Sequence, residues 1–361
     1  QDAGLVAFSA NFALYGDMSD RMMSLAAGLG HRQEVYSIDE CFIDLAGIRG
    51  DLVLRAQKIR ARIHQWTGLP TCIGIGPTKT LAKLANHIAK SAERKPGSYP
   101  PELAQVCHLG SLSVKNLRAL LAATEVGDIW GVGPKLSQQL NQMGIRSAQD
   151  LANLDPVTAQ KRWSIVLAKT VRELNGTACL SLDEVAPDKQ QIACTRSFGN
   201  PVTELDDLLE AITEFATRAA EKLRRQNSQA NQIMAFIRTS PFRQNDQQYS
   251  SYRTIPLPSP TSDSGHITEI ARAIVRHIYR PGYRYAKAGV MLMDLQPDSP
   301  VQLCFSLGGE EPVSRTHLMQ ALDSLNLRYG RGTVRLASAG TAEKKTSMDN
   351  EVRAIVPQLH N

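Results

Sequence analysis

The 361 residues suffice for two or three domains with their own cores, and six scattered cysteines without a C-x-x-C pair argue against structural zinc or a disulfide framework. A formal net charge of +6 favours a polyanionic partner, with nucleic acid ahead of a membrane surface. Because no apolar run approaches bilayer length and no signal peptide opens the chain, we expect a cytoplasmic protein with no membrane partner.

After a first helix predicted over residues 11–27, two carboxylates stand next to each other in an apolar stretch. The stretch Tyr36–Leu45 is apolar and β-branched on both sides of Asp39 and Glu40, which predicts a strand, a tight turn and a second strand. Side chains of neighbouring strand residues point to opposite faces, whereas at a turn both carboxylates can converge. Two half-buried carboxylates repel each other unless a cation or protons neutralise them, and Mg²⁺ prefers such oxygen ligands. A solvated acidic hairpin tip is the simpler alternative.

A helix with two contrasting sides is expected over Thr78–Lys90, after a helix at about 52–66 and a short buried strand at 71–76. Lys79 follows a Gly-rich turn at the start of this helix, where a triphosphate or a nucleic-acid backbone is favoured. A solvated lysine face is the alternative. The apolar side contains Leu81, Leu84, Ala85 and Ile88; the polar side contains Lys79, Lys83, Asn86, His87 and Lys90.

Beyond a Gly/Pro/Ser break at about 96–101, a Gly-Val-Gly turn lies between two short predicted helices. Pro134 suits the first helical position and Gly144 the position after the helix end. This pattern is a helix-hairpin-helix, whose glycines let backbone N–H groups approach a DNA phosphate at a helix N-terminus. The predicted DNA-contacting residues are Gly131, Val132, Gly133 and Lys135.

The last third of the chain predicts a β-α-β-β-α-β order after a polar linker. Its long first helix, over 204–225, has acidic residues in its first turn and basic ones in its last, and Thr203 with Asp206 predicts a capping box. Arg196, Arg238 and Arg253 lie on predicted strands, so one sheet face is a candidate DNA surface; scattered surface arginines are the alternative. From residue 297 the chain turns polar, with one short helix expected at 317–325.

Three motifs occur in the order seen in Y-family translesion DNA polymerases, and within that family the chain resembles the UmuC type over roughly residues 5 to 335. They are Ser37-Ile38-Asp39-Glu40, Gly74-Ile75-Gly76-Pro77-Thr78-Lys79-Thr80-Leu81-Ala82-Lys83-Leu84-Ala85-Asn86 and Trp130-Gly131-Val132-Gly133. Shorter matches continue at Arg196-Ser197-Phe198-Gly199, Thr239-Ser240-Pro241-Phe242 and Lys287-Ala288-Gly289-Val290-Met291-Leu292.

The resemblance implies an α+β fold: a partial polymerase palm, a helix-hairpin-helix thumb, and a little-finger domain with the split β-α-β-β-α-β order. The implied activity is error-prone, template-directed synthesis from dNTPs on primer-template DNA in the SOS response, with two Mg²⁺ ions. Asp39 and Glu40 would be metal ligands and Lys79 the triphosphate contact. The expected divisions are 1–30 (fingers remnant), 31–100 (palm), 101–180 (thumb), 181–191 (linker), 192–296 (little finger) and 297–361 (a partner-binding or disordered tail).

The sequence also departs from the family pattern. The family's first strand, with another metal-binding Asp, and most of the fingers are not in this sequence, so we expect little or no polymerase activity from the 361-residue chain alone. The resemblance implies a UmuD-type accessory protein and a recombinase filament as partners. Gln302–Phe305 stands where the family has a sliding-clamp motif, and its altered spacing leaves clamp binding open.

Two other functions fit parts of the sequence. A non-catalytic remnant of such a polymerase would still bind damaged DNA through its thumb and little finger. A helix-hairpin-helix DNA glycosylase would use an Asp after the Gly-Val-Gly turn, and Asp150 lies at a suitable distance. The glycosylase hypothesis leaves the carboxylate hairpin and the last third of the chain, with its β-α-β-β-α-β order, unexplained. Asp150 also suits the start of a short helix.

Overall fold

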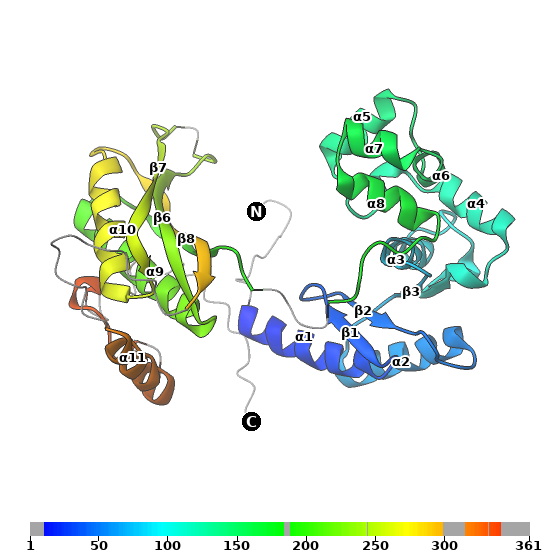
Figure 1. Ribbon diagram of the computed structural model, residues 1–361, viewed down its shortest axis with the longest axis horizontal. Helices are drawn as coiled ribbons and strands as arrows, with labels where there is room; N and C mark the ends of the chain where they lie inside the picture. The colour runs from blue at the N-terminus through cyan, green and yellow to red at the C-terminus, as the bar shows by residue number, and fades with distance from the viewer. Residues whose placement is uncertain (1–10, 184–187, 244, 299–314, 331, 341–361) are drawn as a thin grey trace. The chain divides into compact units, whose positions relative to one another are not determined.

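The computed structural model describes residues 11–183, 188–243, 245–298, 315–330 and 332–340 (Figure 1). These residues divide into two compact units, one within Ala10–Ala186 and one within Pro187–Asn361, here called the N-terminal and C-terminal units. Within the described residues, we find no helix with the length and apolar character needed to span a membrane. Gln302–Phe305 lies outside the described residues.

The first half of the N-terminal unit contains a hairpin and three long helices. The strands of the hairpin pair antiparallel with Val35 opposite Cys41, so the residues between them form the predicted turn. The first helix begins where Asn11 accepts a hydrogen bond from the backbone N–H of Leu14, as an N-cap does. The elements are α1 (Phe12–Ala27), β1 (Arg32–Val35), β2 (Cys41–Asp44), α2 (Leu52–Thr67), β3 (Ile73–Ile75) and α3 (Lys79–Arg94).

The second half of the N-terminal unit is mostly helical. It contributes one strand, β4 (Val106–His108), which pairs parallel with β3 and was not expected from the sequence. Its short helices pack around Leu140, Leu151 and Leu167, all nearly inaccessible to solvent. The remaining elements are η1 (Pro101–Leu103), η2 (Leu109–Ser111), α4 (Val114–Ala123), η3 (Val126–Asp128), α5 (Pro134–Gln142), α6 (Ala148–Ala152), α7 (Pro156–Arg162) and α8 (Ile165–Leu174).

The C-terminal unit has the predicted β-α-β-β-α-β order. Its four strands form one sheet in the order β5-β8-β6-β7, with every adjacent pair antiparallel, so β8 lies between the two strands that flank the long helix. The elements are β5 (Ile192–Val202), α9 (Leu205–Arg225), β6 (Ser228–Thr239), β7 (Ser250–Thr261), α10 (Ser264–Ile278) and β8 (Tyr285–Pro297).

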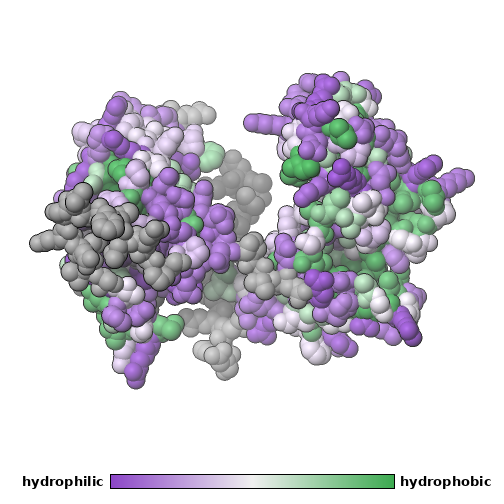
Figure 2. All heavy atoms as spheres, viewed as in Figure 1, coloured by the Kyte–Doolittle hydropathy of each residue, from purple (hydrophilic) through white to green (hydrophobic). Residues whose placement is uncertain are grey.

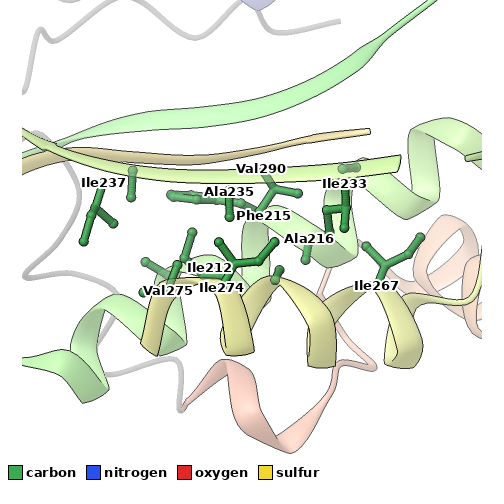
Figure 3. Close-up of a cluster of buried hydrophobic side chains, with 14 of the residues drawn as sticks. Ile212, Phe215, Ala216, Ile233, Ala235, Ile237, Ile267, Ile274, Val275 and Val290 are labelled. Carbon is green, nitrogen blue, oxygen red and sulfur yellow. The ribbon is translucent and has the colours of Figure 1, made fainter. Parts of the chain in front are cut away.

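Both long helices of the C-terminal unit cover the same face of this sheet. In Figure 3 Ile267, Ile274 and Val275 of α10 point toward Ile233 and Ile237 of β6, and all five are buried. The opposite face of the sheet is called the outer face below. In Figure 2 hydrophilic residues cover much of the visible surface of this unit, as expected when the apolar stripes of both helices are used in the core.

The start of α9 differs from the prediction. The helix begins at Leu205, and its N-cap residue, Glu204, has an extended backbone and makes no side-chain capping bond. Thr203 lies one residue too early to cap, and its hydroxyl donates to the Glu204 carboxylate instead. The capping box of Thr203 and Asp206 is therefore wrong. The expected charges are present, with acidic residues in the first turn and basic residues in the last.

The last described helix, α11 (Thr316–Tyr329), is longer than the expected segment 317–325. It is tied to α9 by a two-bonded ion pair, in which the guanidinium of Arg224 donates to both carboxylate oxygens of Asp323 at 2.7 Å. The same guanidinium donates to the carbonyl oxygen of Ser262 at 2.7 Å. A single turn, η4 (Ala337–Ala339), completes the described part of this unit.

Candidate active site and DNA-contacting residues

The tip of the β1–β2 hairpin presents Asp39 and Glu40 side by side. The backbone N–H groups of Tyr36 and Ser37 both donate to the carbonyl oxygen of Glu40 at 3.0 Å, which closes the turn. The Asp39 carboxylate is exposed and accepts a 2.6 Å hydrogen bond from the Ser37 hydroxyl. Both carboxylates thus belong to a turn and the residue that follows it, as the sequence pattern predicts, and not to the middle of a regular strand.

Helix α3 provides the positive charge next to this tip. The ammonium group of Lys83 donates to both carboxylate oxygens of Glu40 at 2.7 Å. It also lies 5.6 Å from the ring centroid of Tyr36, within reach of a cation–π interaction. The alternative of a solvated acidic tip therefore does not describe Glu40, which is half-buried against a cation, whereas Asp39 is exposed.

One turn earlier on α3, Lys79 makes a second ion pair with the hairpin. Its ammonium group donates to Glu34 of β1 and lies 5.0 Å from the ring centroid of Phe42. The Lys79 side chain is only 9% exposed, so the interpretation of this side of α3 as a solvated lysine face fails at Lys79. Glu34 was not predicted, because nothing in its local sequence distinguishes it from other acidic strand residues.

Three aromatic rings connect the hairpin to the Gly-Val-Gly turn. Tyr36 and Phe42 of the hairpin lie 5.5 and 5.6 Å from Trp130, measured between ring centroids. The indole N–H of Trp130 donates to the hydroxyl of Tyr36 at 3.2 Å. The hairpin carrying the carboxylates and the turn predicted to bind DNA are therefore in direct contact within one unit.

A buried carboxylate fixes the start of α3. Glu173 of α8 is fully buried, and one of its oxygens accepts hydrogen bonds from the backbone N–H and the hydroxyl of Thr80, at 2.9 and 2.8 Å. The other oxygen accepts from the backbone N–H groups of Cys179 and Leu180, at 2.9 and 3.0 Å. The hydroxyl of Thr78, the N-cap of α3, donates to the carbonyl oxygen of Glu173. These bonds hold the segment that carries Lys79 and Lys83.

The donor set at the hairpin tip fits a hard divalent cation. Asp39 and Glu40 offer only carboxylate oxygens, and Mg²⁺ commonly takes one or two protein carboxylates while keeping water or substrate phosphates as its other ligands. A cage of three or more His, Cys, Asp or Glu side chains is not found among the described residues. Asp39 and Glu40 therefore suit a cation shared with a phosphate-bearing substrate.

The Gly-Val-Gly turn has the backbone expected of a helix-hairpin-helix. Gly131 has φ of +89°, which a side chain would disfavour, and Gly133 is the N-cap of α5 with Pro134 at the first helical position. Lys135 is exposed in the first turn. Val132 is buried and its N–H donates to the carbonyl oxygen of Ile129 at 2.9 Å, so its backbone N–H is not free for a phosphate.

Asp150 has a structural role. Its carboxylate accepts from the backbone N–H groups of Ser147 and Arg146, at 2.9 and 3.0 Å, and completes a capping box at the start of α6. The hydrogen bonds from Ser147, followed by the one from Arg146, lower the pKa of this carboxyl. A carboxylate committed to backbone N–H groups explains Asp150 without a glycosylase function.

The strand registers separate the three predicted arginines. Arg238 lies opposite Lys287, whose neighbour Ala288 is buried under the helices, so Arg238 and Lys287 share the outer face. Arg196 lies opposite Ala288 itself and therefore belongs to the helix-covered side of the edge strand, although it is exposed. Arg253 likewise contacts His277 of α10 at 2.6 Å. Of the three arginines only Arg238 lies on the outer face, and DNA binding by that face stays a prediction.

Comparison with protein-family models decides what kind of protein this is. The model described as "impB/mucB/samB family" matches residues 2–87, the family's C-terminal domain matches 189–305, and the "IMS family HHH motif" matches 114–145. Protein UmuC of Salmonella typhimurium is 40% identical over 347 residues, covering 95% of this chain and 79% of that protein. Protein ImpB of the same species is 41% identical, covering 93% and 77%, and protein MucB of Escherichia coli is 40% identical, covering 92% and 77%.

The chain belongs to the UmuC/ImpB/MucB/SamB group of Y-family DNA polymerases.

The fold of this family member agrees with a solved relative. A structure titled "Y-family DNA polymerase chimera Dbh-Dpo4(243-245)-Dbh" matches with a TM-score of 0.58 at 17% identity, covering 80% of this chain and 78% of that chain. The resemblance noted from the sequence motifs is thereby confirmed, and so is the predicted α+β polymerase fold with a helix-hairpin-helix and a C-terminal little-finger domain. A further model, for a domain of unknown function (DUF4113), matches residues 316–353, which include α11.

Proposed function

We propose that Asp39 and Glu40 hold Mg²⁺ for template-directed addition of dNTPs to a primer end in translesion synthesis during the SOS response. The observation that supports this most is the contact between α3 and the hairpin: Lys83 pairs with Glu40, next to Asp39 at the tip, and Lys79 pairs with Glu34 of β1. The cation would supply charge neutralisation at the attacking oxygen and at the leaving pyrophosphate.

The chain's own residues would act on different parts of the substrates. Asp39 and Glu40 bind the cation, and Lys79 contacts the triphosphate once it is released from Glu34. The backbone around Gly131 and Gly133, with Val132 packed beneath, binds DNA phosphates together with Lys135. Arg238 extends this contact on the outer face of the C-terminal sheet, whereas Arg196, on the helix-covered side of the edge strand, does not belong to that surface.

A UmuD-type accessory protein and a recombinase filament are the proposed protein partners. The proposed domain divisions remain those given from the sequence.

Two measurements on the same preparations test the proposal. Asp39→Asn and Glu40→Gln should each abolish any Mg²⁺-dependent primer extension, and should leave duplex DNA affinity within about twofold, because DNA binding depends mainly on phosphate contacts. Full extension activity in both variants would contradict the assignment of Asp39 and Glu40. Loss of extension together with a large loss of duplex affinity in these variants would show that the substitutions disturb DNA binding and not the cation alone.

A further inference from the structure

Glu40 has a cation next to it already. The ammonium group of Lys83 lies 2.7 Å from each of the two carboxylate oxygens, the same atoms with which a metal ion would have to bond. The pair is partly exposed, at 20% for the lysine side chain and 35% for the glutamate. An ion pair with this exposure is weak, on the order of 1 kcal/mol or less, so the lysine can be exchanged for another cation.

We infer that Lys83 is a positioning residue that stands in for the metal ion: it holds Glu40 at the hairpin tip and must leave before a divalent cation can bind there. This inference rests on the proposed role of Glu40 as a metal ligand. Without Lys83, Glu40 next to Asp39 would be an uncompensated pair of like charges, which is unfavourable. With Lys83 in place, the carboxylate is neutralised and oriented.

The residues around Lys83 orient its ammonium group toward Glu40. Its ammonium group lies 5.6 Å from the centroid of the Tyr36 ring, and Tyr36 is itself held by the indole of Trp130. The lysine on the previous turn, Lys79, contacts Glu34 and Phe42 instead. The two lysines therefore serve different carboxylates, and only Lys83 competes with a metal ion for Glu40.

The test is titration of the 361-residue protein with Mn²⁺ as the probe, with free Mn²⁺ measured by electron paramagnetic resonance. The proteins are the unmodified chain, Lys83→Met, Lys83→Gln, Glu40→Gln and the double variant Lys83→Met/Glu40→Gln. Lys90→Met is the matched control, because it removes one charge from an exposed position on the same helix. Thermal unfolding of each variant identifies any variant that does not fold. If Lys83→Met does not fold, Lys83→Gln is compared with the unmodified chain in its place.

Removal of Lys83 should tighten Mn²⁺ binding by about two- to fivefold, the factor that corresponds to a partly exposed ion pair. Lys90→Met should change it less than Lys83→Met does, and the gain should disappear in the double variant. Unchanged or weaker binding in both Lys83 variants, with a loss in Glu40→Gln, would overturn the inference and leave Glu40 as a ligand. Unchanged binding in Glu40→Gln would overturn the metal role of Glu40 itself.

Discussion

At the scale of single residues, the buried carboxylate of Glu173 holds the start of α3, the helix that carries Lys79 and Lys83. In the unmodified chain the two carboxylate oxygens of Glu173 accept from four donors: two on Thr80, one on Cys179 and one on Leu180. Glu173→Gln replaces one of these oxygens with an NH₂ group, so two of the four donors face another donor. We expect the N-terminal unit to lose about 2–3 kcal/mol in free energy of unfolding, since buried donors without partners are costly. All three tryptophans lie in this unit, so denaturant titration followed by Trp fluorescence measures it. Glu102→Gln, at an exposed position, is the control, and an equal loss there would contradict the argument.

The thiol of Cys107 should make the stability of the same unit depend on alkaline pH. Burial raises the pKa of Cys107 from the ordinary 9.0 to about 12 in the folded chain. Between these two pKa values the thiol is deprotonated in the unfolded chain but still protonated in the folded chain. The free energy of unfolding therefore does not depend on this thiol below pH 9, and above pH 9 it falls by up to about 1.4 kcal/mol per pH unit. Fluorescence-monitored denaturation at pH 8 and pH 10 should show a smaller decline for Cys107→Ala than for the unmodified chain. An equal decline in Cys107→Ala and in the unmodified chain would refute the prediction.

The residues found from sequence and those missed differ in how their partners are placed. Asp39, Glu40 and Lys79 lie in short sequence motifs that indicate their local structure. The two carboxylates lie at a turn between two strands, and Lys79 lies at a helix start after glycines. Glu34 and Glu173 have no such signal, because Glu34 meets Lys79 across 45 positions and Glu173 meets Thr80 across 93. Only the packed fold brings these pairs together.

At the scale of elements, the contact between β3 and α3 allows no side chain at Gly74. A Cβ there would lie 2.1 Å from the backbone nitrogen of Asn86 and 2.3 Å from the carbonyl oxygen of Ala82, and both are backbone atoms of the helix. We expect Gly74→Ala to lower the free energy of unfolding of the N-terminal unit by about 3 kcal/mol, since the strand and helix must separate. Gly16→Ala is the matched control, because a Cβ at this position in α1 meets nothing within 4 Å. It should stabilise by about 0.5–1 kcal/mol, and a Gly74→Ala protein of unchanged stability would contradict the packing.

Elements with a strong periodic pattern were predicted well, and those defined by tertiary pairing were not. The β-α-β-β-α-β order and the long helix expected over 204–225 are both present, the helix as α9 (Leu205–Arg225). By contrast, β4 has three residues, and its pairing with β3 depends on a long-range parallel contact. The capping box at Thr203 failed although its residue types were suitable, because the helix begins one residue later.

At the scale of the whole molecule, DNA binding is expected to involve both units. The net charge of +6 favours a polyanionic partner. The two side chains proposed to bind DNA lie in different units: Lys135 at the helix-hairpin-helix and Arg238 on the outer face. The sequence indicated both residues, but not that Arg253 turns to His277 instead, since face assignment on a strand depends on its register. Arg253 therefore serves as a negative control for Arg238.

If one DNA molecule contacts both units at the same time, the salt dependence of binding should be additive between Lys135 and Arg238. Each phosphate contact contributes about 0.9 to the slope of log affinity against log salt on duplex DNA. Lys135→Ala and Arg238→Ala should each reduce the slope by about 1, and the double variant by about 2. Fluorescence anisotropy with a primer-template duplex at several salt concentrations gives these slopes, and Arg253→Ala should leave the slope unchanged. If the salt-dependence slope of the double variant equals that of one single variant, the two units do not bind the same DNA molecule at the same time.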